Sequence, residues 1–215
     1  MSLPAQNFAA FGSELQAVYG VYAALLRGRD ASAGLGGSLV YAGALDANAL
    51  GLTRAATIAG AAVLTATQDI SVLRAALRDN AIHFQVTSLD EALRILKNEI
   101  RKQQPVAVAV AADSEVIAEE MRARGVAADA HMPADTALDA GTEFLAFPIP
   151  ENFALRAAAF DEQLFTLLQE SDALNRRWYR GAPSAFGRDY RRMRSLGCDV
   201  ETACKVRAWL EEIES

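Results

Sequence analysis

The chain contains 215 residues, of which 52% are hydrophobic, 22% charged and 7% aromatic, and its formal net charge is −6. This composition excludes a disordered chain, a collagen and a coiled coil, and the length is sufficient to bury a core without disulfide bonds. Because no charge-free apolar stretch reaches about 18 residues, the N-terminus lacks a signal-peptide pattern and the only cysteines are Cys198 and Cys204, we expect a cytoplasmic protein that does not contact a membrane.

Residues 1–34 are expected to form a helical lead-in. One helix is predicted from about Ser13, because apolar side chains recur at three- and four-residue spacing (Leu15, Val18, Tyr19, Tyr22, Leu25 and Leu26). Gly28 and the small residues that follow are expected to end it. The apolar stripe could dock a partner chain. Packing on its own domain is the favoured interpretation, because most amphipathic helices pack in this way.

From Ser38 the pattern alternates between short apolar runs and helical stretches. The predicted strands are residues 38–42, 61–67, 82–87, 106–110 and 126–132. Helix starts are predicted from capping residues, namely Asp69, Ser88 with Glu91, and Asp113 or Ser114. The alternating run at 82–87 indicates a strand with one exposed face, either at an edge of the sheet or at a meeting point. Strands separated by helices predict an α/β fold with a Rossmann-like, doubly wound and mostly parallel sheet.

The remaining chain is predicted to be a loop followed by helices. Residues 133–150 are rich in proline and glycine, and apolar residues from Phe153 to Leu168 suggest one long amphipathic helix. Gly181 and Pro183 are expected to break the helical pattern before a last helix that follows Asp199. We therefore expect three parts, a helical lead-in at 1–34, a Rossmann-like domain at 35–150 and a helical extension at 151–215 that packs on it.

Several segments resemble urocanase (urocanate hydratase). Residues 55–61, Ala-Ala-Thr-Ile-Ala-Gly-Ala, look like the helix that follows the nucleotide loop of that enzyme. Other similar segments follow in the same order, at residues 36–39, 87–93, 105–110, 124–126 and at Asp129. The resemblance covers residues 35–132. It implies the NAD-binding Rossmann-like domain of that family, here as a stand-alone and degenerate copy.

The resemblance also indicates where a cofactor would bind. The family's loop is rich in glycine, so that backbone amides can approach the dinucleotide phosphates. At residues 43–51 this chain retains only two glycines, and its side chains would push a phosphate outward. By resemblance, the candidate cofactor-binding residues are Gly43, Ala44, Leu45, Asp46, Ala47 and Asn48, with Thr67 near a ribose and Asp113 where the family has asparagine. NAD is a candidate cofactor by resemblance, and no cofactor is assigned from the residues themselves.

No catalytic residue is assigned. Urocanase has a reactive cysteine in a Tyr-Cys-Leu-Gly-Ser-Gly setting, which neither Cys198 nor Cys204 resembles, so hydratase activity is not expected. Asp46, Asp69 and Asp113 all follow predicted strands, and helix capping is their favoured role. Two uncapped carboxyl groups close together would instead support acid–base chemistry.

Neither of the two histidines is predicted to belong to a metal site. His131 lies at the carboxyl end of the last predicted strand, where open α/β sheets bind ligands, but an ordinary loop histidine is the favoured interpretation. His83 is expected to be exposed or hydrogen-bonded. Asp129 and His131 alone are too few ligands for zinc, so no metal is expected.

An arginine-rich stretch spans residues 176–194. It has one acidic residue, Asp189, and seven arginines, with aromatic residues interleaved (Arg176, Arg177, Arg180, Arg188, Arg191, Arg192, Arg194; Trp178, Tyr179, Phe186, Tyr190). This composition suits nucleic acid or phosphorylated ligands, but the acidic remainder makes a solvated face or a subunit contact the favoured interpretation. A homodimer through the N-terminal stripe or the C-terminal helices is a candidate assembly.

Two functions remain open from the sequence. The favoured one is a binding protein that takes an unknown small molecule, or interacts with a partner, without hydratase activity. The alternative is an enzyme that binds NAD(P) or another nucleotide. Substitutions in the loop at 43–51 favour the first function, because they affect the step that would anchor a diphosphate.

Overall fold

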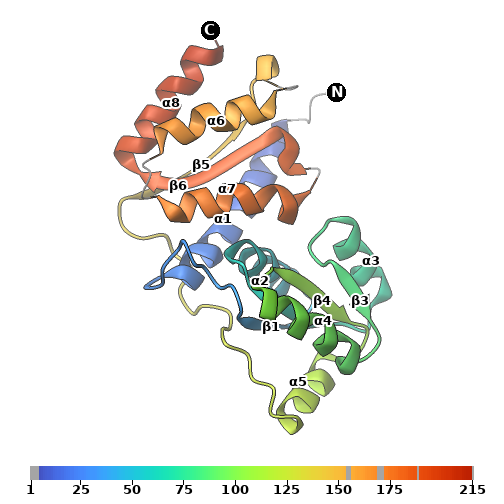
Figure 1. The fold of residues 1–215 in the computed structure, drawn as a ribbon. Coiled ribbons are helices and arrows are strands. Elements are labelled where there is room, and N and C mark those ends of the chain that lie inside the picture. Colours follow the sequence, from blue (N-terminus) through green and yellow to red (C-terminus); the bar gives the residue numbers. More distant parts are fainter. Residues whose placement is uncertain (1–4, 154–155, 169–171, 188, 215) are drawn as a thin grey trace.

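Figure 1 shows a computed structural model of the chain, which describes residues 5–153, 156–168, 172–187 and 189–214. Its centre is a four-stranded parallel sheet of order β1-β2-β4-β3, which confirms the predicted Rossmann-like α/β fold. The edge position of β3 is one of the two predicted positions. The strands are β1 (Leu39–Ala44), β2 (Ala62–Ala66), β3 (Phe84–Val86) and β4 (Val106–Val110). The helices around them are α2 (Ala47–Ala59), α3 (Ile70–Arg78), α4 (Leu89–Lys102) and α5 (Ser114–Ala123).

The sheet is covered on both faces, because alternate side chains of its central strands enter two hydrophobic cores. Val63 and Ala107 face the core that contains α2 and α3. Leu64 and Val108 face the core that contains α4 and α5. Every residue of β2 and β4 is buried. This explains why their sequences are continuous apolar runs with no polar alternation.

The predicted helix starts are confirmed. The side chains of Asp69, Ser88 and Asp113 each accept hydrogen bonds from amides of the first turn that follows them. The Glu91 carboxylate accepts the amide of Thr87, one residue before the position expected in a capping box. Local side-chain chemistry therefore fixes where these helices begin.

The predicted strand at residues 126–132 is wrong. The structure has a single parallel bridge there, between Val40 and Ala130. The reason lies beside it, because the Asp129 carboxylate accepts the backbone amide of Leu39 at 2.7 Å. A side chain thus occupies a hydrogen bond that a longer ladder would need.

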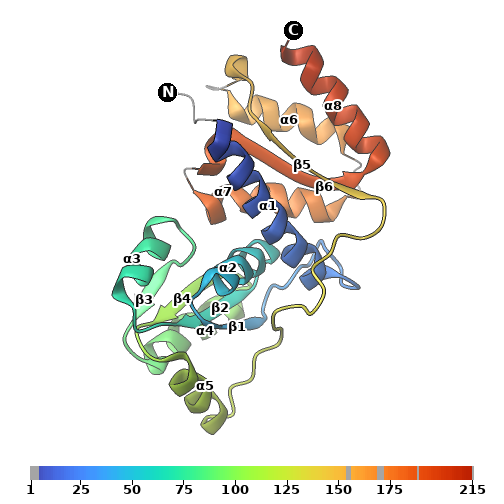
Figure 2. The ribbon, with the colours of Figure 1, turned by 180° about the vertical axis from the view of Figure 1, so that it is seen from behind.

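Helix α1 (Ala5–Leu26) begins earlier than the predicted start near Ser13. Its apolar stripe is buried, with Leu15 and Tyr22 fully inaccessible, and it packs across α2 and against the C-terminal strands (Figures 1 and 2). The stripe is therefore covered by its own chain, as favoured above. A homodimer stays a prediction. No described helix has the length and apolar character needed to span a bilayer.

The C-terminal part differs most from prediction. Strand β5 (Thr142–Pro148) lies in the segment predicted to be a loop and pairs antiparallel with β6 (Met193–Asp199), which the sequence pattern did not reveal. The predicted boundary after residue 150 separates these two paired strands. Beside them lie α6 (Ala157–Leu167), α7 (Ala173–Phe186) and α8 (Val200–Glu214), with one-turn 3-10 helices at Glu151–Phe153 and Asp189–Arg192.

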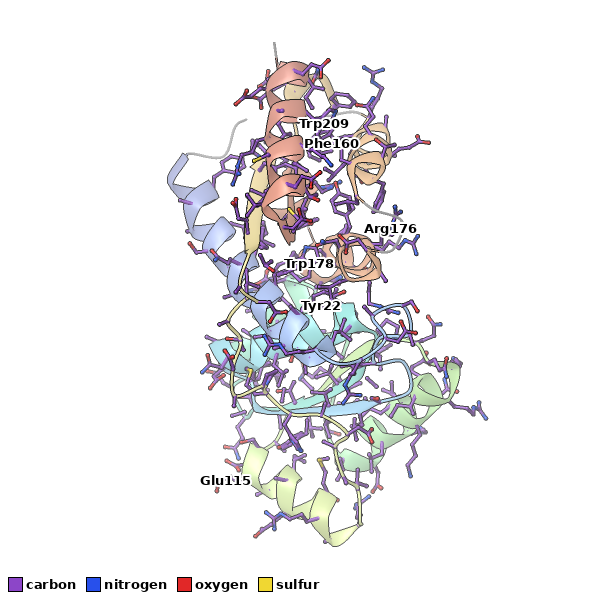
Figure 3. All side chains as sticks on the ribbon, turned by 90° about the vertical axis from the view of Figure 1, so that its left-hand side faces the viewer. Tyr22, Glu115, Phe160, Arg176, Trp178 and Trp209 are labelled. Carbon is purple, nitrogen blue, oxygen red and sulfur yellow. The ribbon has the colours of Figure 1, made fainter. Side chains whose placement is uncertain are left out.

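The prediction that Gly181 and Pro183 break the helical pattern is wrong, because both residues lie inside α7. At Gly181, α7 touches α2 so closely that an added Cβ would lie 3.0 Å from a methyl carbon of Ile58. Packing thus stabilises a helix that local propensity disfavours. Tyr22 and Trp178 join α1 to α7 in the same region, with ring centroids 5.3 Å apart, and Phe160 and Trp209 join α6 to α8 (Figure 3).

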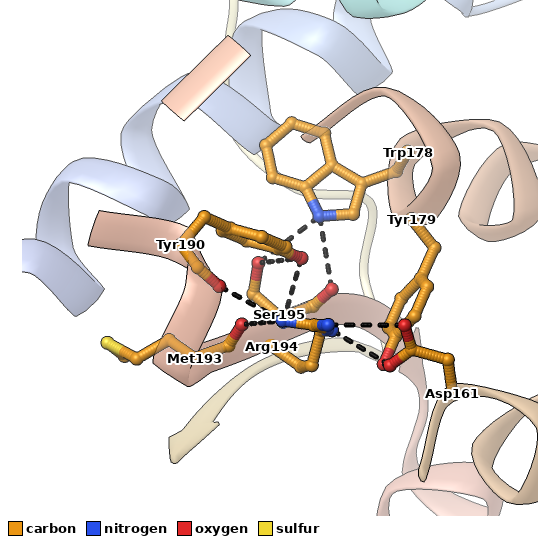
Figure 4. A network of polar contacts seen from close by, with 7 residues as sticks. All are labelled: Asp161, Trp178, Tyr179, Tyr190, Met193, Arg194 and Ser195. Atoms are coloured by element: carbon orange, nitrogen blue, oxygen red, sulfur yellow. Dashed lines mark hydrogen bonds and ion pairs between the residues drawn. The ribbon is translucent and has the colours of Figure 1, made fainter. Parts of the chain in front are cut away.

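A network of polar contacts joins α6, α7 and β6 in the C-terminal part (Figure 4). Arg194 is only 5% exposed, and its guanidinium donates to both carboxylate oxygens of Asp161, at 2.9 and 3.1 Å. It also donates to the carbonyls of Tyr190 and Met193. Trp178 donates its indole N–H to the Ser195 carbonyl at 3.0 Å. The aromatic residues interleaved with the arginines are buried, namely Trp178, Tyr179, Phe186 and Tyr190.

Candidate functional site

The turn between β1 and α2 is the place where the resemblance puts a cofactor. It is short, because β1 ends at Ala44 and α2 begins at Ala47. Leu45 is 5% exposed, and its amide donates to the Ala66 carbonyl at 3.0 Å. Asp46 is the N-cap of α2, since its carboxylate accepts the Ala49 amide at 2.8 Å. This turn therefore uses its polar groups to stabilise its own fold.

Gly43 is the one loop glycine with a positive φ, at +73°. It lies at an irregularity in the register between β1 and β2, and its carbonyl accepts the Thr65 hydroxyl at 2.9 Å. A β-bulge of this kind favours glycine. Gly51, by contrast, lies within α2, where an added Cβ would meet no atom within 4 Å. Neither glycine is arranged as part of a phosphate-binding loop.

The other predicted cofactor residues also have structural partners. Thr67 follows β2 and accepts the Asp69 amide at 3.2 Å. Asp113 accepts the amides of Glu115 and Val116, as the cap of α5. Hydrogen bonds from Ser71 lower the pKa of Asp69, so this carboxyl group has no raised pKa for acid catalysis. Asp46, Asp69 and Asp113 each cap a helix, as the favoured interpretation predicted.

A dinucleotide does not fit this arrangement at the amino end of α2. The position that a diphosphate would take beside the helix is next to the Asp46 carboxylate, which already accepts the Ala49 amide. A second anion there would be repelled by the first and would lack that amide as a donor. The residues of this turn therefore do not fit NAD.

A pocket of about 290 Å³ lies beside this turn, between α1 and α2. Two of the predicted site residues, Ala47 and Asn48, line it. The other walls are mostly apolar and include Val18, Val21, Leu50 and Met132. A neighbouring hollow of about 560 Å³ shares Asn48 and Met132 and continues along residues 133–138. The first amides of α2 have no partner within their own helix, so hydrogen-bond donors border an apolar space.

Arg54 gives this pocket a second polar group. Its side chain is 14% exposed, pairs with Glu14 of α1 and lies over the ring of Phe186, 5.0 Å from the centroid. Its Nε is buried and has no hydrogen-bond partner among the described residues. Such a donor is costly to bury. Sequence reasoning missed Arg54 and Glu14, although a single arginine within the apolar stretch of α2 was a usable signal.

The histidines have separate environments. His83 is structural, because its Nδ1 accepts the Ala107 amide at 2.8 Å, and burial lowers its pKa. His131 is exposed and lines another pocket, of about 320 Å³, with Tyr41 and Arg122. Asp129 is engaged with the backbone of Leu39. Within the described part of the chain, no three histidine, cysteine or acidic side chains are grouped to hold a metal ion.

Both cysteines lie in the C-terminal part, away from the sheet edge just described. Cys198 of β6 is buried, and burial raises the pKa of its thiol to about 12. Cys204 is exposed on α8. A buried thiol with a raised pKa is a poor nucleophile, because the thiolate is the reactive form.

A comparison with known protein families agrees with the observed fold. A family model described as the urocanase Rossmann-like domain matches residues 17–141, which is more than half of the chain. The chain belongs to this family. The match to the urocanase Rossmann-like domain starts within α1 and ends immediately before β5, so it includes the sheet and excludes the β5–β6 pair. No curated protein matches the chain.

Proposed function

We propose that this member of the urocanase Rossmann-like family binds a small molecule in the α1–α2 pocket and has no hydratase activity. The observation that supports the proposal most is that an apolar pocket beside the turn joins the amino end of α2 to Arg54, whose buried Nε has no described partner. Ligand pockets commonly have this composition, with apolar walls and a few placed polar groups.

The size of the pocket limits the ligand. Its volume of about 290 Å³ is at the lower end of the range for ligand sites and is too small for a dinucleotide. Glu14 compensates most of the charge of Arg54. We therefore propose a small, mostly apolar molecule with one acceptor group, such as a monocarboxylate, that lies beside Arg54 and the amino end of α2.

The absence of hydratase activity is proposed from the cysteines. Urocanase has a reactive cysteine in a setting that this sequence lacks. Cys198 is buried with a raised pKa, and Cys204 lies on α8.

The test uses Gly51, which lines the pocket and has open space around its Cβ position. Gly51→Leu adds an apolar side chain at a residue that lines the pocket, starting from a Cβ position with open space, and Gly51→Ala is the matched control, which improves helix propensity with little added volume. Native mass spectrometry of gently purified protein and ligand-observed NMR with benzoate, phenylacetate and hexanoate measure binding. We expect binding to the wild type and to Gly51→Ala and at least a tenfold loss in Gly51→Leu. Equal binding by all three proteins, or no bound molecule in either measurement, would contradict the proposal.

A nucleotide-binding enzyme is the second candidate, favoured by the family match. It predicts stoichiometric NAD or NADP in the native mass spectrum and a rise in melting temperature at micromolar NAD. It also predicts that replacing Ala47 and Ala49 by glycine improves nucleotide affinity, since phosphate access would increase. A retained dinucleotide would replace the small-molecule proposal with this one.

A further inference from the structure

A larger hollow lies at the opposite edge of the sheet, where the parallel strands begin. Its volume is about 710 Å³, and it is bounded by α7 on one side and by Gly60 and Pro105, just before β2 and β4, on the other. Three arginines of α7 line it, namely Arg176, Arg177 and Arg180. We call this hollow the arginine groove. It shares no lining residue with the α1–α2 pocket.

Arg177 is held in a fixed position in the groove. Its Nε donates to the Ala31 carbonyl at 2.8 Å, and its terminal nitrogen donates to the Ser32 carbonyl. The guanidinium lies so near Gly34 that an added Cβ there would be 2.6 Å from Cζ. Glycine at position 34 thus makes room for a charged group, whose position is set before any ligand arrives.

Arg180 lies one turn along α7 from Arg177, on the same side of the helix. It is exposed and has no ion-pair or hydrogen-bond partner among the described residues. Arg176 is the third guanidinium, packed over the ring of Phe165 at 5.4 Å (Figure 3). The groove therefore has one anchored cation and one cation without an ion-pair partner among the residues that the structure describes, with a third beside them.

Other groups that face the groove determine the sign of its charge. None of the described lining residues is acidic, and Gln103 and Gln104 add amide donors. Asp30 is the acid that interacts with Arg177, and its carboxylate is bound by the hydroxyl and amide of Ser32. The carboxyl ends of α2 and α4 also border the groove and contribute partial negative charge. Among the described residues, no carboxylate pairs with the guanidinium of Arg180.

The shape of the groove favours a small anion over nucleic acid. Single-stranded nucleic acid needs aromatic rings on which its bases stack. Trp178, Tyr179, Phe186 and Tyr190 are buried in the interior, and none of them lines the groove. Arg188 lies outside the described residues, as do the side chains of Asp189 and Arg191. Arg194 is bound to Asp161. Arg192 does not line the groove, and Arg176, Arg177 and Arg180 form a compact cluster in a space the size of a small ligand.

We propose that the arginine groove binds a small organic phosphate, with Arg177 and Arg180 as its principal ligands. A guanidinium donates two parallel hydrogen bonds to a phosphate, and paired guanidinium groups suit a dianion. The proposal is independent of the small-molecule site, because it concerns the other edge of the sheet.

The test is isothermal titration calorimetry of the full chain with inorganic phosphate, pyrophosphate and glycerol 3-phosphate. We expect binding that weakens with added salt and that falls at least tenfold in Arg180→Gln. Arg74→Gln is the matched control, because Arg74 is an exposed arginine on α3 outside the groove, and it should bind as the wild type does. Arg177→Gln should lose binding too. Since Arg177 also ties down residues 31–32, its melting temperature should fall, whereas that of Arg180→Gln should not.

Three results would overturn the proposal. They are no heat from any of the three anions at millimolar concentration, equal affinity of Arg180→Gln and Arg74→Gln, and tighter binding of a thymidine 20-mer than of pyrophosphate. The last result would assign the groove to nucleic acid. Gly51→Leu should leave phosphate binding unchanged, so failure at one edge is distinguishable from failure at the other.

Discussion

At the carboxyl edge of the sheet, aspartates occupy the amino ends of three helices, whereas at the amino edge arginines of α7 line a groove. In a Rossmann-like fold the first of these edges is where anionic ligands bind, because helix dipoles point their positive ends there. Here that attraction is satisfied internally by carboxylates of the chain. The charge suited to an anion is instead supplied by side chains at the other edge. Fold membership alone therefore does not locate a ligand site.

The largest expected effect comes from making the same substitution at both edges. Gly34→Ala places a Cβ 2.3 Å from the Ala59 carbonyl at a positive φ, and should cost about 3 kcal/mol of unfolding free energy. Gly43→Ala has the same sign of φ but open space, and should cost only about 1–2 kcal/mol. Urea unfolding measures both losses. Equal losses would mean that the amino edge is not tightly packed around Arg177.

A smaller effect is expected from the cap of α2. Asp46→Ala removes the acceptor of the Ala49 amide and should cost about 1 kcal/mol, whereas Asp46→Asn should cost a few tenths because asparagine also caps. Thermal or urea unfolding compares the two. If the asparagine variant also gains pyrophosphate affinity in an Arg180→Gln background, the charge of Asp46 is what excludes anions from this edge. A loss as large as that of Asp46→Ala would show that the charge itself stabilises α2.

The smallest effect concerns the edge strand. Burial lowers the pKa of His83, so the native state favours the neutral ring that accepts the Ala107 amide. This contribution to stability is complete above the unfolded pKa of about 6.5 and is lost as the pH falls through the lower native value. Unfolding free energy should therefore decrease from pH 7.5 to 5.5, and His83→Gln should show a shallower decrease. An identical pH profile for the two proteins would remove His83 from this role.

Much of the Rossmann-like part was predictable, because its signals are local. Asp69, Ser88 and Asp113 cap helices that begin immediately after them, and the apolar run of β4 is a buried strand. Of the predicted cofactor residues, Ala47 and Asn48 border a pocket, but the pocket's Arg54–Glu14 pair joins two helices and leaves no periodic pattern. The resemblance thus indicated residues that border a pocket, but it did not indicate Arg54 and Glu14.

The C-terminal part was poorly predicted, because its structure depends on distant contacts. Strand β5 follows Gly141 and ends at Pro148, residues that indicate loops, and its partner β6 comes only after two α-helices and two 3-10 helices. Gly181 is a helix breaker by propensity but fits α7 against Ile58. Arginines and aromatics at 176–194 suggested a surface, yet Trp178 and Arg194 are buried. Packing decided each of these cases against the local preference.

The hydroxyl of Tyr19, near the start of the chain, donates to Asn175 and to the carbonyl of Gly197, near its end. A ribosome synthesises Tyr19 long before either acceptor exists, so the side of α1 that faces β5, β6 and α7 stays uncovered until β6 has emerged, although α2 can already pack on the helix. Premature termination between residues 111 and 192 would leave this side of the first helix without β6. We therefore expect truncated products to be cleared by proteases or bound by chaperones, although their parallel sheet is complete.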